Sequence, residues 1–279
     1  MNNSAISAMV SLTSMQNRLD VIADNIANMD TNGYKRKESS FEDTLTRVQN
    51  QGKDFKQPGR VTPLGYNLGF GVRLASVTMN MQQGTLQETG IPTDLAIEGN
   101  ALFAVESNGN TAYTREGAFH FVPDPADGDY MLLVNNQGDR VLNNDARSVP
   151  VRVLANSKVA IDSTGNVWTT LPGSKTTRIT NSLRIVEPQK PEGLVQLSDN
   201  LFTLAAGLTT DEVFGAGSPS PTRGDDPQVA IRSGFLEKSN VDLTTEMADM
   251  VQVQRAYQLV ARTLTSSDTL MNLANNMRG

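Results

Sequence analysis

The chain has no cysteine and a single histidine, His120, among its 279 residues. Without cysteine it can form neither a disulfide framework nor a thiolate metal site. The chain can therefore fold equally well in an oxidising or a reducing compartment. Histidine is the commonest acid–base group near neutral pH, and here Phe119 and Phe121 flank it in a strand-like context. An exposed or hydrogen-bonded strand position is therefore a better interpretation of His120 than a catalytic role.

Motifs for cofactor or metal chemistry are missing as well. The sequence has no phosphate-binding glycine loop, zincin helix or nucleophile elbow. Gly69 and Gly71 lack the third glycine and the following helix of a dinucleotide site. The carboxylates in residues 124–129 resemble half of a calcium loop but lack the EF-hand spacing and its bidentate glutamate, so we interpret them as a turn. We expect no enzymatic activity, no cofactor and no bound metal.

Positive charge and long apolar runs are also scarce. The formal net charge is −6, which argues against nucleic acid as a partner, because phosphate-backbone binding needs a clustered positive surface. The basic cluster at residues 35–37 is short and is interpreted as a solvated turn. No stretch approaches the roughly 18 apolar residues of a membrane span. No basic residue precedes the first apolar residues, as in a secretory signal, so export would need another route.

Turn-forming residues are plentiful, whereas aromatics make up only 5% of the chain. Between the turns, short apolar or alternating runs recur at a spacing that predicts an antiparallel β domain. These runs lie at residues 72–81, 94–97, 102–105, 130–134, 149–154, 159–161 and 229–231. Before them we expect a short helical or irregular stretch at residues 41–48 and an extended Gly/Pro-rich segment at 58–71.

Both ends of the chain carry apolar residues at alternating spacings of four and three, which is typical of a coiled-coil stripe. The N-terminal stripe comprises Met1, Ala5, Ala8, Leu12, Met15, Leu19, Ile22, Ile26 and Met29. The C-terminal stripe comprises Leu243, Met247, Met250, Tyr257, Ala261, Leu264 and Met271, with Gln254, Asp268 and Asn275 as polar interruptions of the pattern. Gly33 is the expected stop of the first helix, and Ser239 and Asn240 offer an N-cap for the last.

The predicted fold class is α+β, with N- and C-terminal α-helices forming a coiled-coil-like pair, a central antiparallel β-rich domain and an extended Gly/Pro-rich connecting segment. We assign residues 1–30 and 240–279 to a terminal helical assembly domain, 31–82 to the connecting segment and 83–239 to the β-rich domain.

The stripes have two interpretations. Docking of an amphipathic helix on its own core is the commonest reason for such a pattern. However, Ile6, Met9 and Val10 lie off the N-terminal stripe, so more than one face is apolar and one neighbouring helix would not cover it. We therefore interpret both stripes as assembly surfaces that other copies of the chain cover, with ends that are partly disordered before assembly.

The residues that close the first helix carry a more specific signal. Residues 23–35, Ala-Asp-Asn-Ile-Ala-Asn-Met-Asp-Thr-Asn-Gly-Tyr-Lys, resemble the N-terminal signature of flagellar rod and hook proteins. Similar blocks follow in the family's order at residues 83–99, 113–119 and 234–257. The matching motif residues are Asn25, Asn28, Thr31, Gly33, Tyr34, Lys35, Gln254, Arg255 and Ala256.

This resemblance implies a structural subunit of the bacterial flagellar basal-body rod, most like the distal-rod member of the family. It implies self-assembly into a helical tube that transmits torque from motor to hook, with an inner layer of paired helices and the β domain outside. The implied partners are further copies, other rod and hook proteins and the flagellar type III export apparatus. The implied location is the basal body, after export across the cytoplasmic membrane.

Three alternatives remain open from the sequence. The first is a hook or hook-associated axial protein. The second is a β domain that binds a glycan or surface protein and is multimerised by coiled-coil ends for avidity. The third is a cell-wall hydrolase, which is disfavoured because the chain has few side chains suited to acid–base catalysis.

Overall fold

The computed structural model describes residues 3–43, 47–50, 65–68, 72–145, 149–171, 177–198, 200–215 and 229–277. Most of the expected Gly/Pro-rich segment, including Gly69 and Gly71, lies outside the described residues. The chain divides into two compact units. The helical unit contains residues 1–26, 37–78 and 242–279, and the β unit contains residues 27–36 and 79–241.

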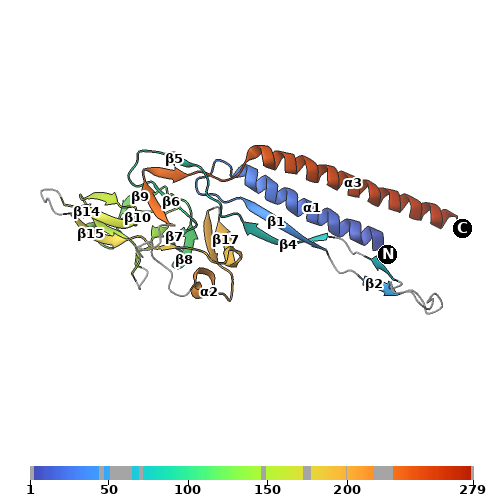
Figure 1. Ribbon diagram of the computed structural model, residues 1–279, viewed down its shortest axis with the longest axis horizontal. Coiled ribbons are helices and arrows are strands. Elements are labelled where there is room, and N and C mark those ends of the chain that lie inside the picture. The colour runs from blue at the N-terminus through green and yellow to red at the C-terminus, as the bar shows by residue number, and fades with distance from the viewer. Residues whose placement is uncertain are drawn as a thin grey trace, which may run out of the picture. The chain divides into compact units, whose positions relative to one another are not determined.

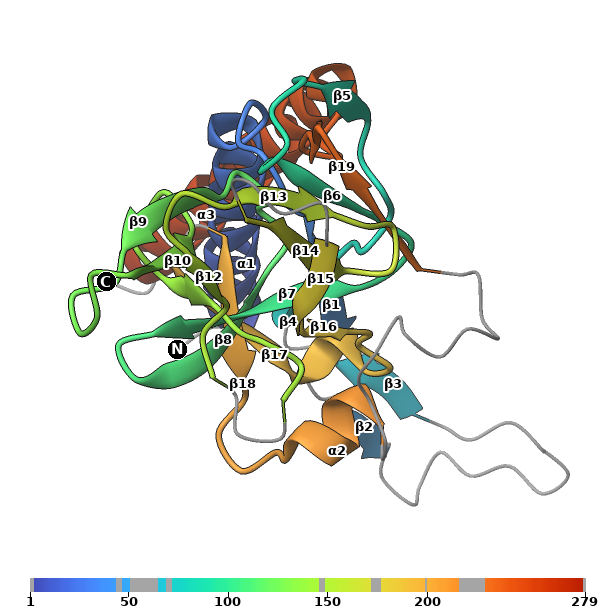
Figure 2. The same cartoon turned by 90° about the vertical axis from the view of Figure 1, so that its left-hand side faces the viewer.

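Two long helices dominate the helical unit. α1 (Asn3–Ala27) and α3 (Leu243–Asn276) lie side by side and antiparallel, as both views show (Figures 1 and 2). Asp242 caps α3: its carboxylate accepts hydrogen bonds from the backbone N–H of Thr244, at 3.0 Å, and from the hydroxyl of Thr245, at 2.7 Å. These bonds lower the pKa of Asp242. The cap is therefore Asp242 rather than the expected Ser239 or Asn240.

The rest of the helical unit is β structure. β1 (Lys37–Asp43) pairs with β4 (Val72–Met79), and β2 (Arg47–Asn50) pairs with β3 (Gly65–Leu68). The expectation of a helical or irregular stretch at residues 41–48 is wrong for residues 41–43 and 47–48, which are strands. Part of the reason is long-range pairing: the hydroxyls of Ser40 and Ser76 lie 2.8 Å apart across β1 and β4, a partner that local sequence cannot reveal.

The β unit contains a nine-stranded antiparallel sheet, as predicted from the recurring apolar runs. Its main path is β12-β10-β11-β7-β8-β18-β17, with β9 paired to β10 and β16 paired to β7. The strands are β7 (Leu102–Ser107), β8 (Asn110–Thr114), β9 (His120–Pro123), β10 (Tyr130–Val134), β11 (Arg140–Val141), β12 (Arg152–Leu154), β16 (Ile185–Val186), β17 (Leu194–Ser198) and β18 (Leu201–Leu204).

Three smaller antiparallel sheets complete the unit. Their orders are β13-β14-β15, β19-β6 and β20-β5. The strands are β5 (Leu86–Glu88), β6 (Leu95–Glu98), β13 (Lys158–Ile161), β14 (Asn166–Thr170), β15 (Thr177–Ser182), β19 (Ala230–Ser233) and β20 (Phe235–Glu237). A 3₁₀ turn, η2 (Pro191–Gly193), and the short helix α2 (Thr210–Phe214) lie near β17 and β18 in the sequence.

Strand β7 explains how the core is built. Its side chains alternate between two buried clusters, with Phe103 and Val105 in one and Leu102 and Ala104 in the other. Phe103 packs edge-on against Phe119, with ring centroids 5.2 Å apart. A strand buried on both faces reads as a continuous apolar run, which is why residues 102–105 stood out in the sequence.

Candidate functional site

The residues that the sequence offered as candidates for catalysis or metal binding do not come together in one site. His120 is exposed on β9, in agreement with its interpretation as a strand position. Asp124 accepts a hydrogen bond from the backbone N–H of Ala126 at 2.9 Å and pairs with Arg152, as a turn residue does. Among the described residues, no three His, Asp or Glu side chains gather as a metal site. The neighbouring carboxylates Asp225 and Asp226, which the sequence favours as part of a turn, lie outside the described residues.

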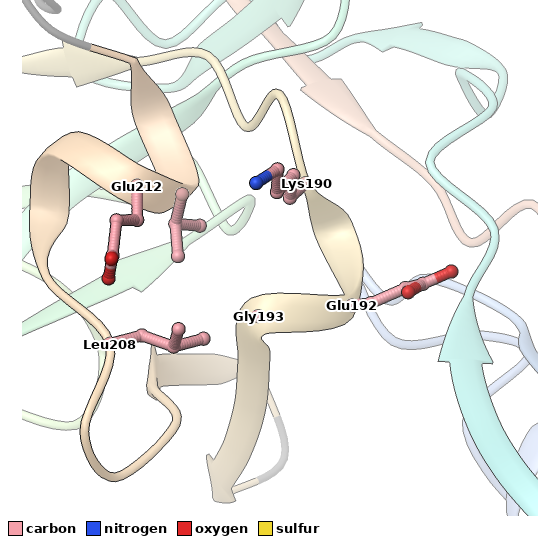
Figure 3. Close-up of a pocket in the computed structure, with 6 residues that line it drawn as sticks. Lys190, Glu192, Gly193, Leu208 and Glu212 are labelled. Atoms are coloured by element: carbon pink, nitrogen blue, oxygen red, sulfur yellow. The ribbon is translucent and has the colours of Figure 1, made fainter.

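A polar hollow of about 340 Å³ lies beside α2 (Figure 3). Lys190 and Glu212 lie on its two sides, and Glu192 points away from it. The carboxylate of Glu212 closes the capping box of α2 by accepting the backbone N–H of Thr209 at 2.9 Å, and this bond lowers its pKa. The hollow therefore lacks a convergent acid–base pair.

The end of the signature, in contrast, is deeply buried in the β unit. The Lys35 ammonium donates hydrogen bonds to the backbone carbonyl of Gln82 and to Oε1 of Glu237, both at 2.7 Å. The Lys35 and Glu237 side chains are each 1% exposed. The interpretation of residues 35–37 as a solvated turn is therefore wrong for Lys35, which is an internal anchor.

Arg115 completes this arrangement from the block at residues 113–119. Its Nε donates to Oε2 of Glu237 at 2.5 Å, and its side chain is fully buried. Its two terminal nitrogens donate to the backbone carbonyls of Ala101, Ile97 and Gly99. The guanidinium thus links Glu237 to the turn that follows β6.

Glycines allow the chain segments to approach this cluster. Gly33 adopts φ +72°, and a Cβ there would lie 2.6 Å from the backbone carbon of Arg115. Its N–H donates to the carbonyl of Glu237 at 2.8 Å. Gly84 donates its N–H to Oε1 of Glu237 at 2.8 Å, and a Cβ there would lie 2.0 Å from the carbonyl oxygen of Lys238. We call Gly33, Lys35, Gly84, Arg115 and Glu237 the clasp.

The charge balance of the clasp is two cations to one carboxylate. Burial lowers the pKa of Lys35, and the nearby Arg115 charge lowers it further, whereas Glu237 opposes both. Every clasp charge has hydrogen-bond partners within the unit, so the cluster resembles a structural ion network rather than a site awaiting a substrate. The sequence blocks contained Arg115 and Glu237, but nothing in their spacing indicated that they meet.

A second hydrogen-bonded cluster lies within the helical unit and is centred on Asn25, in the earlier part of the signature. The Asn25 amide accepts the backbone N–H of Lys37 at 2.9 Å and donates to the Lys37 carbonyl at 3.0 Å, as a neighbouring strand would. It also donates to Oε2 of Glu246 at 3.3 Å. Asn25 is 1% exposed. One side chain therefore fixes the end of α1, the start of β1 and the first turn of α3.

The remaining motif residues have more ordinary positions. Asn28 accepts the Thr31 hydroxyl at 3.2 Å in the turn that follows α1. Tyr34 is buried in the β unit, next to Lys35 in the chain. Gln254 and Arg255 are exposed on α3, and Ala256 is half-buried.

The residues of the two stripes differ in exposure. In the N-terminal stripe, Ile22 is buried and Ala8, Leu12, Met15, Leu19, Ile26 and Met29 are half-buried. In the C-terminal stripe, Leu243, Met247 and Tyr257 are exposed and Met250, Ala261 and Leu264 are half-buried. The side chains of Met1, Ala5 and Met271 lie outside the described part. On α3 the fully buried positions are Glu246 and Val253, which lie to one side of the stripe.

Between α1 and α3 runs a groove of about 270 Å³. It is lined by Ser11, Ser14, Met15, Arg18, Gln252, Val253 and Ala256. Three of these side chains, those of Ser11, Ser14 and Ala256, are small, and Met15 belongs to the N-terminal stripe.

Comparison with known proteins decides the family. Residues 3–35 match the profile "Flagella basal body rod protein", residues 96–169 match "Flagellar hook protein FlgE/F/G D1 domain" and residues 232–277 match "Flagellar basal body rod FlgEFG protein C-terminal". The chain is 31% identical to the flagellar hook-basal body complex protein FlhP of Bacillus subtilis over the full length of both chains. The chain belongs to the flagellar basal-body rod family.

Two relatives named FlgG, flagellar basal-body rod protein, extend this result. The protein of Borreliella burgdorferi is 31% identical, with 96% of this chain and 95% of the relative covered. That of Agrobacterium fabrum is 32% identical, with 96% of each chain covered. As a member of the rod family the chain is a structural, non-enzymatic component of the basal-body rod. No helix in its described part is long and apolar enough to cross a membrane.

The rod family profiles also coincide with the clasp. Lys35, Arg115 and Glu237 fall one each in the three matched segments. Residues that are far apart in the sequence, each in a different family segment, therefore meet in one buried ion network. The end of the signature thus takes part in a structural network inside the β unit.

Proposed function

We propose that this rod subunit polymerises with copies of itself into a helical tube that transmits torque between motor and hook, and that its terminal helices make the contacts. The observation that carries the proposal is the apolar surface that α1 and α3 leave exposed. Met9 on α1 is 62% exposed, and Met247 and Val251 on α3 are 55% and 47% exposed. Burial of such side chains drives association.

The proposal assigns separate tasks to the parts of the chain. Residues 1–30 and 240–279 form the assembly domain, with both stripes and the motif residues Gln254 and Arg255 in or beside the contacts. The β-rich domain at residues 83–239, closed by the clasp, is the rigid body of the subunit. Identical subunits joined by heterologous contacts that do not close form an open helix, which suits a rod.

Its partners, beyond further copies, are other rod and hook proteins at the two ends of the tube. The flagellar type III export apparatus delivers the chain across the cytoplasmic membrane. The lack of cysteine supports this route, because such a chain needs no oxidative folding.

A charge introduced into the exposed stripe tests the proposal. Met247→Glu places a carboxylate at a 55% exposed position, so the isolated subunit should keep its stability while assembly is lost. Thr263→Glu is the matched control, because Thr263 is also exposed but lies about 160° around α3 from Met247 and about 120° from Val251. Sedimentation and electron microscopy of the purified chain measure assembly. Filaments from Met247→Glu as abundant as those of the unaltered chain would remove this stripe from the interface.

A further inference from the structure

The dipeptide Asn-Gly occurs twice in the chain, at Asn32-Gly33 and at Asn108-Gly109. An asparagine that precedes glycine is prone to lose its side-chain amide spontaneously, because glycine has no side chain to hinder attack by its own backbone nitrogen. Both copies of the dipeptide lie in the β unit. The fold gives them opposite surroundings.

The reaction uses only the chain and water. The backbone nitrogen of the glycine gives up its proton to the solvent and attacks Cγ of the asparagine. A bond forms between that nitrogen and Cγ, the bond from Cγ to Nδ2 breaks, and Nδ2 leaves as ammonia. Water then opens the succinimide ring on either side of the nitrogen, which gives aspartate or isoaspartate. The peptide unit between the two residues must rotate to bring the nitrogen against Cγ, so hydrogen bonds that hold this unit oppose the reaction.

The peptide unit between Asn32 and Gly33 is held on both sides. The Asn32 carbonyl accepts a hydrogen bond from Nδ2 of Asn200 at 2.9 Å, and the Gly33 N–H donates to the Glu237 carbonyl at 2.8 Å. Gly33 is buried against the backbone of Arg115. This peptide unit therefore cannot rotate unless the clasp opens.

Asn108 and Gly109, in contrast, form the turn between β7 and β8, just beyond the last strand pair of Ser107 with Asn110. Both turn residues are exposed, and a Cβ at Gly109 would meet no atom within 4 Å. In the described part of the chain, no hydrogen bond engages the Asn108 carbonyl or the Gly109 N–H. This peptide unit can therefore rotate at the tip while the two strands stay paired.

The conformation of the turn sets the movement that is needed. Asn108 and Gly109 have φ values of +52° and +79°, as in the two-residue turns that join antiparallel strands. The turn has to leave this conformation before the Gly109 nitrogen reaches Cγ of Asn108. Opening of an exposed loop tip takes almost no free energy, whereas opening of a core takes nearly the whole free energy of unfolding.

We infer that Asn108 is a site of spontaneous modification in the folded chain, where it changes to aspartate and isoaspartate, and that the clasp protects Asn32 from the same reaction. The modification adds a negative charge at the tip of the β7–β8 hairpin and leaves the clasp unaltered. The fold thus directs this chemical change away from the signature and toward one exposed turn.

Peptide mass spectrometry of the full purified chain tests the inference. The chain would be incubated in mildly alkaline buffer, once folded and once in urea, until half of both asparagines have reacted in urea. Digestion then separates the peptide that contains Asn32 from the one that contains Asn108, and the mass gain from amide to acid measures the converted fraction of each.

In the folded chain, conversion of Asn108 should exceed that of Asn32 by at least about tenfold, because only Asn32 needs the clasp to open. In urea the two should convert at similar rates. Equal conversion of both in the folded chain would overturn the inference. So would an Asn108 that stays intact in the folded chain, since the turn itself would then prevent the reaction.

Two variants assign the cause. Asn108→Gly keeps a residue that accepts positive φ and removes the reactive amide, so the acidic species that isoelectric focusing separates from the unmodified chain should disappear. Glu237→Gln weakens the clasp, so Asn32 should convert several-fold faster than in the control Glu88→Gln. An undiminished acidic species in Asn108→Gly, or equal Asn32 conversion in Glu237→Gln and its control, would overturn the corresponding half of the inference.

Discussion

At the scale of single residues, Glu237 is the one carboxylate of the clasp. It accepts hydrogen bonds from Lys35, Gly84 and Arg115 while being almost fully buried. Glu237→Gln would leave two buried cations without a counter-charge, and breaking a buried ion pair in this way costs about 3–5 kcal/mol.

Urea unfolding of the β unit, followed by the fluorescence of Trp168, measures this loss. Glu88→Gln is the control, because Glu88 is an exposed carboxylate on the neighbouring strand β5. Equal unfolding midpoints for Glu237→Gln and the unaltered chain would show that the clasp contributes nothing to stability.

Glu116, beside the clasp arginine in the chain, gives a pH-dependent prediction. Burial raises its pKa above the ordinary 4.5, and a hydrogen bond from Asn136 only partly offsets this. Because the folded chain binds this proton more tightly than the unfolded chain, the stabilisation present at low pH is lost as the pH rises through the folded pKa. Above its folded pKa the carboxylate is charged while it is buried.

Glu116→Gln removes that charge and can keep the bond from Asn136, so its urea midpoint at pH 7 should exceed that of the unaltered chain. The difference should shrink as the pH falls below about 4.5, where the carboxyl group is neutral in both states. A difference that stays constant between pH 7 and pH 4 would mean that burial of the charge is not its cause.

Lys35 shows why the sequence alone did not reveal that a charged residue is buried. A run of three basic residues normally indicates a solvated surface, and two of its members lie at least partly in contact with solvent. Lys35 is buried only because Glu237, about two hundred residues later, reaches it. Such long-range pairing leaves no local pattern, whereas the family signature marked the residue without revealing its role.

At the scale of elements, the junction around Asn25 predicts a local effect. Its amide satisfies both backbone groups of Lys37, so Asn25→Ala leaves a buried N–H and carbonyl unpaired. Unpaired buried groups cost about 1–3 kcal/mol. We expect the helical unit to lose roughly this much, measured by helix circular dichroism in urea, while the β unit keeps its Trp168 transition.

Asn28→Ala is the comparison, because the Asn28 side chain accepts the Thr31 hydroxyl in the turn that follows α1, whereas the Asn25 side chain bonds the backbone of Lys37. A loss as large from Asn28→Ala as from Asn25→Ala would contradict the role of Asn25 as the joint between α1, β1 and α3.

The elements themselves were predictable to different degrees. Helical periodicity located α1 and α3 closely, because a 3.6-residue repeat is a local property of the chain. The apolar runs located β6, β7 and β10 for the same reason. Residues 41–43 and 47–48 were not predicted as strands, since their strand state depends on partners in β4 and β3. The groove between the helices also escaped prediction, because all but one of the residues that line it, Met15, lie outside the two stripes.

At the scale of the whole molecule, we propose that the terminal helices present surfaces that other subunits cover. The dilute chain should therefore show less helix than α1 and α3 together provide, and a protease should trim its ends first. Polymerisation should raise the helical circular dichroism signal and protect both ends. Full helicity and intact termini in a chain proven monomeric by ultracentrifugation would contradict folding on assembly.

Electron microscopy of basal bodies tests the central claim most directly, in cells that lack this chain and are supplied with variants of it. The account predicts that cells without the chain, and cells with only Met247→Glu, build a shortened rod with no hook. Cells with Thr263→Glu should build a complete rod and hook. Complete rods and hooks in cells lacking the chain, or in cells with only Met247→Glu, would contradict the account.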